Sequence, residues 1–153
     1  MRLALVLMVI AGAALGQDAV VDETIVKACH AEAGPGEDQP SCVGAAARMC
    51  QAQPGGDTTL GTTECLMAET AVWTDLMHAA YAAQVEALDE GERNLEAQLA
   101  VAQDAWNAYR EAECGLRYGY WIDGSIRTII AAACHLEKTA ARTRELRSLG
   151  DME

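Results

Sequence analysis

Residues 89–149 constrain the fold more than any other stretch, because they predict two helices that must pack on each other. At about 100° per residue, one face of the first helix holds four residues within an arc of about 140°: Trp106, Tyr109, Arg110 and Cys114. The matching face of the second helix holds five: Cys134, Thr139, Arg142, Glu145 and Leu146. The two faces are natural partners, and Cys114 and Cys134 can meet across them.

The connection between these helices, residues 115–124, contains three glycines and an aromatic cluster. We expect it to be too rich in glycine to continue the helix and short enough to form an antiparallel hairpin. Exposed aromatic side chains in a loop are typical of protein interfaces. The candidate interface residues are Arg117, Tyr118, Tyr120 and Trp121, and the alternative is that they pack onto the end of the bundle.

Residues 1–16 have the pattern of a cleaved signal peptide. Arg2 is followed by an apolar run from Leu3 to Leu15, and small residues precede the predicted cleavage point at Gln17. The apolar run is shorter than the roughly 20 residues of a membrane span, and no cysteine follows the cleavage point to carry a lipid anchor. We therefore expect a periplasmic or secreted protein without a membrane span.

The chain is strongly acidic, with 11 basic and 23 acidic residues. This charge disfavours nucleic acid as a partner, because phosphate binding needs the opposite sign. A cationic protein is the favoured partner, since opposite net charges accelerate encounter. The alternative is that the acidity serves only solubility.

Six cysteines remain after the predicted cleavage point: Cys29, Cys42, Cys50, Cys65, Cys114 and Cys134. An even number in an oxidising compartment predicts three disulfides. Fifteen connectivities exist, and spacing alone does not select one. We choose the pairing of neighbours along the chain, because it suits helices joined by short loops.

Hydrophobic residues recur at threes and fours along the chain, and no segment alternates with period two, so we expect an all-α fold. The predicted helices are residues 18–33, a short helix capped by Ser41, a long helix capped by Thr62 or Thr63, and the two helices above. A capping box from Asp89 to Glu92 predicts a break before the fourth helix, and the fifth begins near Asp123 or Ser125.

The chain length supports one core. We expect a single disulfide-stapled bundle of three long helices with a short two-helix N-terminal layer. The predicted divisions are the signal peptide 1–16, a cysteine-containing helical segment 17–61 and a helical domain 62–149.

The sequence offers little for catalysis or metal binding. Cys29-His30 and Cys134-His135 pair adjacent residues, which point about 100° apart on a helix and seldom bind one ion. Ser125 lies at a predicted helix start and reads as a cap, with no nucleophile motif around it. We expect no enzyme, no metal and no cofactor.

Arg110 and Arg142 each lie on a face with apolar residues, where an unpaired guanidinium is unfavourable. We expect each to meet a carboxylate and fix the helix register, with ligand binding as the alternative. Trp106 and Tyr109 are expected to be core anchors. The candidate carboxylates are Glu69, Asp75, Glu111 and Glu145.

These residues, together with Trp73-x2-Leu76-x4-Tyr81 and Gln103-x2-Trp106, resemble the LprI-type lysozyme-inhibitor family over roughly residues 65–149. The resemblance implies an exported, disulfide-bonded helical domain that inhibits lysozyme. It also implies a Cys114–Cys134 disulfide and a fold-defining role for Trp106, Arg110 and Arg142. The function predicted is inhibition of a cationic lysozyme-type muramidase by surface occlusion; the alternative is a non-enzymatic envelope or stress-related structural protein.

Overall fold

The structure is a computed structural model that describes residues 19–33, 40–88 and 94–150. These residues form five helices and no strand, which confirms the all-α class. The helices are α1 (Glu23–Glu32), α2 (Ala45–Gln51), α3 (Thr59–Ala87), α4 (Leu95–Tyr120) and α5 (Arg127–Arg147). The predicted signal peptide and the predicted capping box from Asp89 to Glu92 lie outside the described residues.

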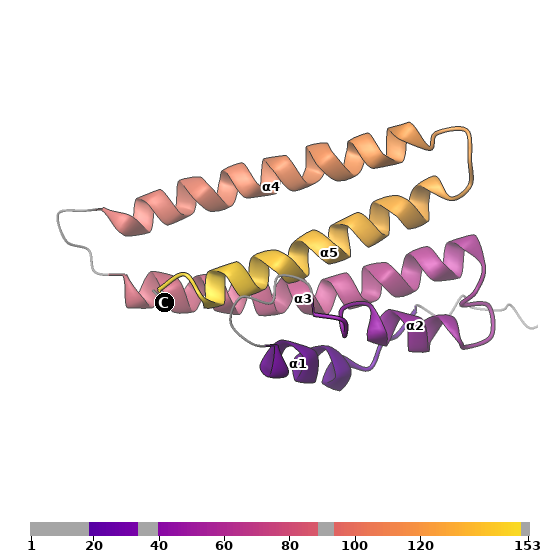
Figure 1. The fold of residues 1–153 in the computed structure, drawn as a ribbon, viewed down its shortest axis with the longest axis horizontal. Helices are drawn as coiled ribbons and strands as arrows, with labels where there is room; N and C mark the ends of the chain where they lie inside the picture. The colour runs from indigo at the N-terminus through magenta and orange to yellow at the C-terminus, as the bar shows by residue number, and fades with distance from the viewer. Residues whose placement is uncertain (1–18, 34–39, 89–93, 151–153) are drawn as a thin grey trace, which may run out of the picture.

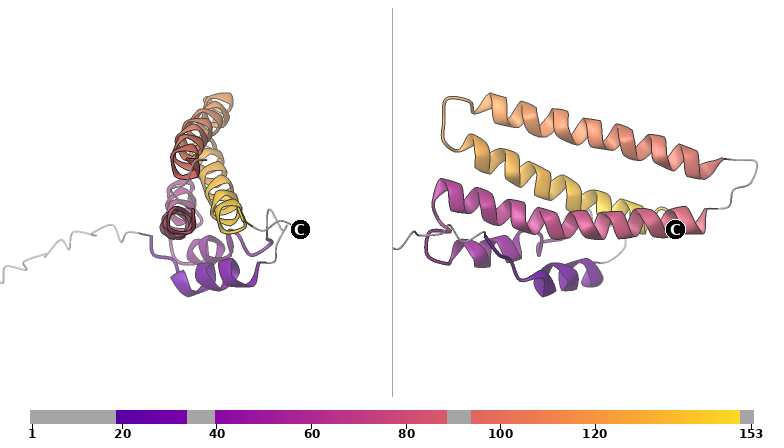
Figure 2. Two further views of the ribbon diagram at one scale, coloured as in Figure 1. Left: turned by 90° about the vertical axis from the view of Figure 1, so that its left-hand side faces the viewer. Right: turned by 180° about the vertical axis from the view of Figure 1, so that it is seen from behind.

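The three long helices are arranged with α5 between α3 and α4 (Figure 1). The short helices α1 and α2 pack against α3, on the side of the bundle away from α4 (Figure 2). Figure 1 also shows that α3 and α4 diverge toward the α4–α5 connection. The α4–α5 hairpin therefore forms one edge of the molecule, and the N-terminal layer forms the other.

The main core lies where α1, α2, α3 and α5 meet. Trp73 is its largest fully buried side chain, and Val26, Ala46, Leu136 and Ala140 are buried around it. Thr143 on α5 donates a hydrogen bond to the carbonyl of Trp73 at 3.2 Å, which fixes α5 against α3. Burying a side chain as large as Trp73 is a major stabilising contribution for a domain of this size.

A second cluster joins α4 to the rest of the bundle. Met77, Leu99 and Leu146 are buried together there, and Tyr81 and Trp106 pack against them. The Gln103 side-chain amide donates a hydrogen bond to the sulfur of Met77 at 3.7 Å. This cluster lies toward the start of α4, so the far half of α4 extends away from α3 (Figure 1).

Three disulfides pair the six cysteines in their order along the chain: the first with the second, the third with the fourth, and the fifth with the sixth. They are Cys29–Cys42, Cys50–Cys65 and Cys114–Cys134. The first two tie the N-terminal layer together and attach it to α3, and the third joins α4 to α5. Closed loops of 13 to 20 residues each restrict the unfolded chain.

Helix α2 has no capping side chain of its own, so the prediction of a Ser41 cap is wrong. The buried carboxylate of Glu69 on α3 replaces it, with one oxygen accepting the N–H of Gly44 and the other the N–H of Ala47, each at 2.7 Å. The indole N–H of Trp73 donates to the same carboxylate at 3.2 Å. Glu69 is therefore committed to α2, and it pairs with neither of the two arginines for which it was a candidate.

Three other helix starts differ from the prediction. Asp22 caps α1 by accepting the N–H of Thr24 at 2.9 Å, and Thr58 caps α3, so neither Thr62 nor Thr63 does. Helix α5 begins at Arg127 without a side-chain cap, so Asp123 and Ser125 are not caps. In each case a hydroxyl or carboxylate near the start of an apolar pattern marks the region of a helix end and not its exact residue.

Helix α4 continues through Gly115 and Gly119 to Tyr120, and the prediction that it ends before residue 115 is wrong. Glycine in a helix is unfavourable by only about 1 kcal/mol relative to alanine, which tertiary contacts readily offset. Here the Cys114 disulfide and the packing of Tyr118 against Arg127 hold the last two turns of α4 on α5. The connection is correspondingly short.

Candidate functional site

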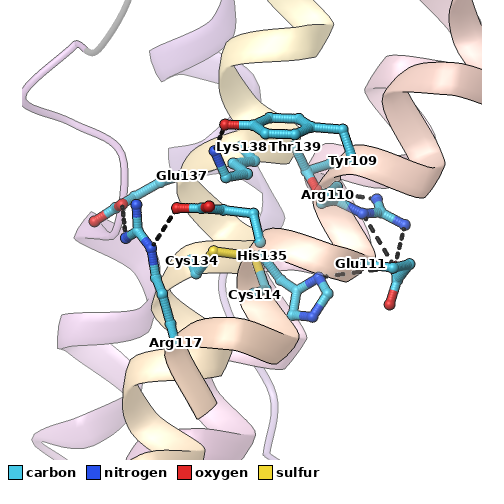
Figure 3. The surroundings of a disulfide bond; sticks show 11 residues. Tyr109, Arg110, Glu111, Cys114, Arg117, Cys134, His135, Glu137, Lys138 and Thr139 are labelled. Carbon is cyan, nitrogen blue, oxygen red and sulfur yellow. Dashed lines mark hydrogen bonds and ion pairs between the residues drawn. A yellow bond between two sulfur atoms is a disulfide. The ribbon is translucent and has the colours of Figure 1, made fainter. Parts of the chain in front are cut away.

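The far end of the α4–α5 hairpin is rigidly built. The Cys114–Cys134 disulfide is fully buried between the helices (Figure 3). Beyond it, the guanidinium of Arg127 lies 5.6 Å from the centre of the Tyr118 ring and donates to its hydroxyl at 2.9 Å. Arg127 also donates to the carbonyl of Gly124 at 3.0 Å, which ties the connection to the first turn of α5.

The outer face of the hairpin carries polar contacts within and between its two helices. Arg117 lies 3.1 Å from Glu113 on its own helix and 3.8 Å from Glu137 on α5 (Figure 3). The ammonium of Lys138 donates to the hydroxyl of Tyr109 at 2.9 Å. Tyr109 is exposed on the surface of α4, so it is not the core anchor that was expected.

Large apolar side chains are exposed where α4 ends and α5 begins. Tyr120 is 81% exposed and Trp121 is 47% exposed, with their rings in edge-to-face contact at 5.7 Å. Five exposed apolar residues lie at this end, and together we call them the hairpin tip: Leu116, Tyr120, Trp121, Ile122 and Ile126. Of the candidate interface residues, Tyr120 and Trp121 belong to the tip, whereas Tyr118 packs inward on Arg127 and Arg117 is occupied by its ion pairs.

Trp106, Arg110 and Arg142 lie together at the α4–α5 contact. The guanidinium carbons of Arg110 and Arg142 are 4.9 Å and 5.9 Å from the Trp106 ring. Arg110 pairs with Glu111 at 3.0 Å and Arg142 with Glu145 at 2.9 Å, so these two carboxylates, and not Asp75, are the partners. Arg142 also donates to the Gln103 side chain at 3.0 Å, which links α5 to α4.

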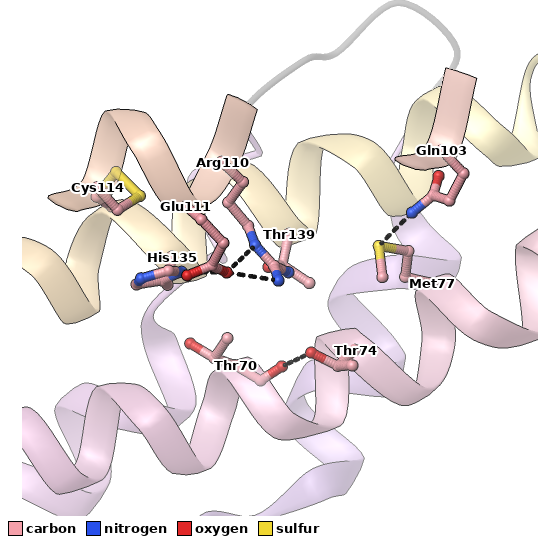
Figure 4. A network of polar contacts seen from close by, with 10 residues as sticks. Thr70, Thr74, Met77, Gln103, Arg110, Glu111, Cys114, His135 and Thr139 are labelled. Carbon is pink, nitrogen blue, oxygen red and sulfur yellow. Dashed lines mark hydrogen bonds and ion pairs between the residues drawn. A yellow bond between two sulfur atoms is a disulfide. The ribbon is translucent and has the colours of Figure 1, made fainter. Parts of the chain in front are cut away.

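A groove of about 540 Å³ opens between α3 and α4 and has α5 as its floor. It exists because α4 leaves α3 beyond the Met77–Leu99 contact while the disulfide keeps α4 on α5. Its walls are mainly apolar, from residues such as Met67, Ala71, Ala131 and Ala132. The guanidinium of Arg110 and the imidazole of His135 lie at the end near the middle of the bundle (Figure 4).

Two features of the structure were not predicted from the sequence: the role of Glu69 as the acceptor for the first N–H groups of α2, and the groove. Glu69 occupies the buried stripe of α3 between Cys65 and Trp73, and an acid in such a stripe signals a buried partner. The groove has no comparable signal, because it depends on the angle between α3 and α4.

All six cysteines are bonded, and no group of ligating side chains among the described residues suits a metal ion.

Within the described residues, no helix has the length and hydropathy to cross a bilayer. The fold and these surfaces define a disulfide-stapled, all-α protein whose exposed apolar and charged groups suit binding.

The chain belongs to the lysozyme inhibitor LprI family, whose pattern matches residues 50–146. The match includes α3, α4, the hairpin tip and nearly all of α5. An uncharacterized protein of Rhizobium meliloti (strain 1021) is 29% identical over 136 residues, covering 82% of this chain and 90% of that protein. No solved structure matches the chain.

Proposed function

We propose that this protein is an exported inhibitor that blocks a cationic, lysozyme-type muramidase without any catalysis of its own. The hairpin tip carries this proposal. It places exposed Tyr120 and Trp121 at the end of a stiff hairpin, within the segment that matches the family. Enzymes that cleave glycans bind their substrate between two carboxylates in a cleft, and an apolar projection that covers such a cleft excludes the glycan chain.

The charge of the protein supports a cationic target. Within the described residues, Lys27, Arg110, Arg117 and Arg142 lie in ion pairs with neighbouring acids. Several exposed acids have no such pair with another described residue: Glu64, Glu86, Glu96, Asp104 and Asp123. A surface of this kind attracts a positively charged enzyme over a distance of about 10 Å at 0.1 M salt.

Export is supported by the signal-like residues 1–16 and by the three disulfides, which form and persist in oxidising compartments. In this compartment the protein would meet muramidases that attack the cell wall. Occlusion needs no reactive group on the inhibitor, only a surface that fits and stays rigid.

The test is the clearing of a cell-wall suspension by a cationic lysozyme, with and without the purified protein, over a series of salt concentrations. We expect inhibition at low salt that weakens as the salt concentration rises. Unchanged clearing at low salt would contradict the proposal and favour a structural role in the cell envelope.

A further inference from the structure

The groove between α3 and α4 is more apolar than its residue types suggest. Several threonines line it, yet their hydroxyls are turned to backbone carbonyls: Thr70 donates to Leu66 at 2.7 Å, and Thr74 donates to Thr70 at 2.9 Å. A hydroxyl that donates within the helix has no proton left to donate to a ligand. With Ala71, Ala131 and Ala132 also in the lining, the exposed surface of the groove is mostly apolar.

One end of this groove holds a carboxylate between two basic groups. An oxygen of Glu111 accepts from the guanidinium of Arg110 at 3.0 Å and lies 4.0 Å from Nδ1 of His135 (Figure 4). Arg110 also donates to the hydroxyl of Thr139 at 3.4 Å, which holds its guanidinium toward α5. Glu111 itself is on the surface, with its side chain 63% exposed, so it can leave without disturbing the core.

We propose that this groove binds a free fatty acid, whose carboxylate takes the place of the Glu111 carboxylate between Arg110 and His135. The acyl chain then lies along α5, toward the hairpin tip, against the apolar lining from α3 and α5. Charge favours this ligand, because Arg110 can form paired hydrogen bonds with a carboxylate and already binds that of Glu111. The volume of the groove, about 540 Å³, is within the usual range for small-molecule sites.

The length of the groove sets the length of the ligand. Its α3 wall runs from Thr63 to Thr74, which is roughly 16 Å at about 1.5 Å per residue. A saturated chain advances about 1.3 Å per carbon for bonds of about 1.5 Å, so about twelve carbons match this wall. Each methylene buried in the groove should tighten binding about four-fold, so affinity rises with chain length until the chain extends past the tip.

The test is calorimetric titration of the purified protein with laurate, below the concentration at which laurate forms micelles. We expect one laurate per protein and no binding of dodecylamine, which has the same chain and the opposite charge. Glu111→Gln removes the competing carboxylate, and we expect it to tighten laurate binding about five-fold. Glu113→Gln is the matched control, because Glu113 pairs with Arg117 away from the groove, and it should leave the affinity unchanged.

Met67→Glu places a charge on the apolar wall at an exposed position that the fold tolerates, and it should weaken binding about ten-fold or more. Absence of laurate binding by the parent protein would overturn the proposal. Equal binding of dodecylamine, tighter binding by both glutamine variants, or an unchanged affinity in Met67→Glu would also overturn it. None of these results depends on lysozyme, so this proposal and the proposed inhibition stand or fall separately.

Discussion

The carboxylate of Glu69 accepts the backbone N–H of Gly44 at 2.7 Å, across 25 residues of sequence. Helix α2 thus begins with hydrogen bonds supplied by α3. The first N–H groups of a helix have no partner within it, and burying them without one is unfavourable. A negative charge at this position also interacts favourably with the helix dipole.

Glu69→Ala should therefore destabilise the protein strongly. It leaves the N–H groups of Gly44 and Ala47 and the indole N–H of Trp73 without their acceptor in a buried site. We expect a loss of about 2–4 kcal/mol in the free energy of unfolding, measured by urea denaturation. Glu86→Ala, at an exposed position of the same helix, is the control and should change it by less than about 0.5 kcal/mol. A small effect of Glu69→Ala would mean that water replaces the carboxylate.

Removing the Cys114–Cys134 disulfide by substituting both residues with alanine should lower stability by about 3 kcal/mol, since it opens a loop closed over 20 residues. The measurement is the melting temperature of each protein with and without a reducing agent. The parent has three disulfides to lose and the variant has two, so the reductant should lower the melting temperature of the parent by more. The same variant should inhibit lysozyme less well, since the hairpin loses the bond that holds α4 on α5. Full inhibition by the variant would argue against a rigid hairpin.

Replacing Tyr120 and Trp121 together by serine should weaken inhibition of lysozyme at least about ten-fold while leaving the fold intact. Both side chains are exposed, and aromatic residues of this kind dominate the binding energy of protein interfaces. Val101→Ser, an equally exposed apolar position on α4 far from the tip, is the matched control. Inhibition constants from cell-wall clearing compare the variants, and an equal loss in the control would exclude the tip as the binding surface.

Gly115→Ala should stabilise the protein by about 0.5–1 kcal/mol. A Cβ at this position of α4 meets nothing within 4 Å, and alanine is the better helix former. Gly61→Ala is the contrasting substitution, because its Cβ overlaps the carbonyl oxygen of Gly55 and should destabilise the protein. Denaturation midpoints give the sign of each change, and a destabilising Gly115→Ala would contradict a helical residue 115.

His30 should make stability depend on pH. Burial lowers its pKa, and the positive charges of Arg147 and Arg144 lower it further. Its ring packs edge-on against Trp73 at 5.9 Å, and its Nδ1 has no hydrogen-bond partner within the described residues. A histidine whose pKa is lower in the folded state binds its proton more readily in the unfolded chain. Its contribution to stability is therefore present above pH 6.5, the ordinary value, and is lost as the pH falls below it.

The expected result is that the melting temperature falls less between pH 7.5 and pH 5.5 in His30→Gln than in the parent protein. His78→Gln removes an exposed histidine from α3 and serves as the control, and it should show the dependence of the parent. Identical pH dependence in all three proteins would show that the buried imidazole does not contribute.

The helical period was enough to predict the long helices, because residues such as Trp73 and Leu146 recur at the spacing of a buried stripe. It was not enough for their ends. Gly115 lies inside α4 because a disulfide and the Tyr118–Arg127 contact outweigh its low propensity, and a window of sequence contains neither effect. The partners of Arg110 and Arg142 were among the four candidates, since carboxylates one or three residues away are the nearest available.

The hairpin tip was partly predictable, because aromatic residues in a connection favour an interface. Which of them face outward depends on Arg127, whose contact turns Tyr118 inward and leaves Tyr120 and Trp121 exposed. The groove was not predictable from the sequence. Its mostly apolar lining includes threonines, which count as polar residues in a sequence although their hydroxyls are bonded within the helix. Its shape comes from the divergence of α3 and α4, which no local sequence pattern predicts.

The dependence of α2 on Glu69 also sets an order of events during synthesis. The chain is made from its N-terminus, so Cys29 and Cys42 are available to each other before residue 69 exists. Helix α2 acquires its N-terminal hydrogen bonds only after α3 has been made as far as Glu69 and Trp73. The cysteines of both disulfides in the N-terminal layer, Cys29–Cys42 and Cys50–Cys65, all precede Glu69 in the chain, so α2 gains its buried acceptor only from a residue that is made after all four of them.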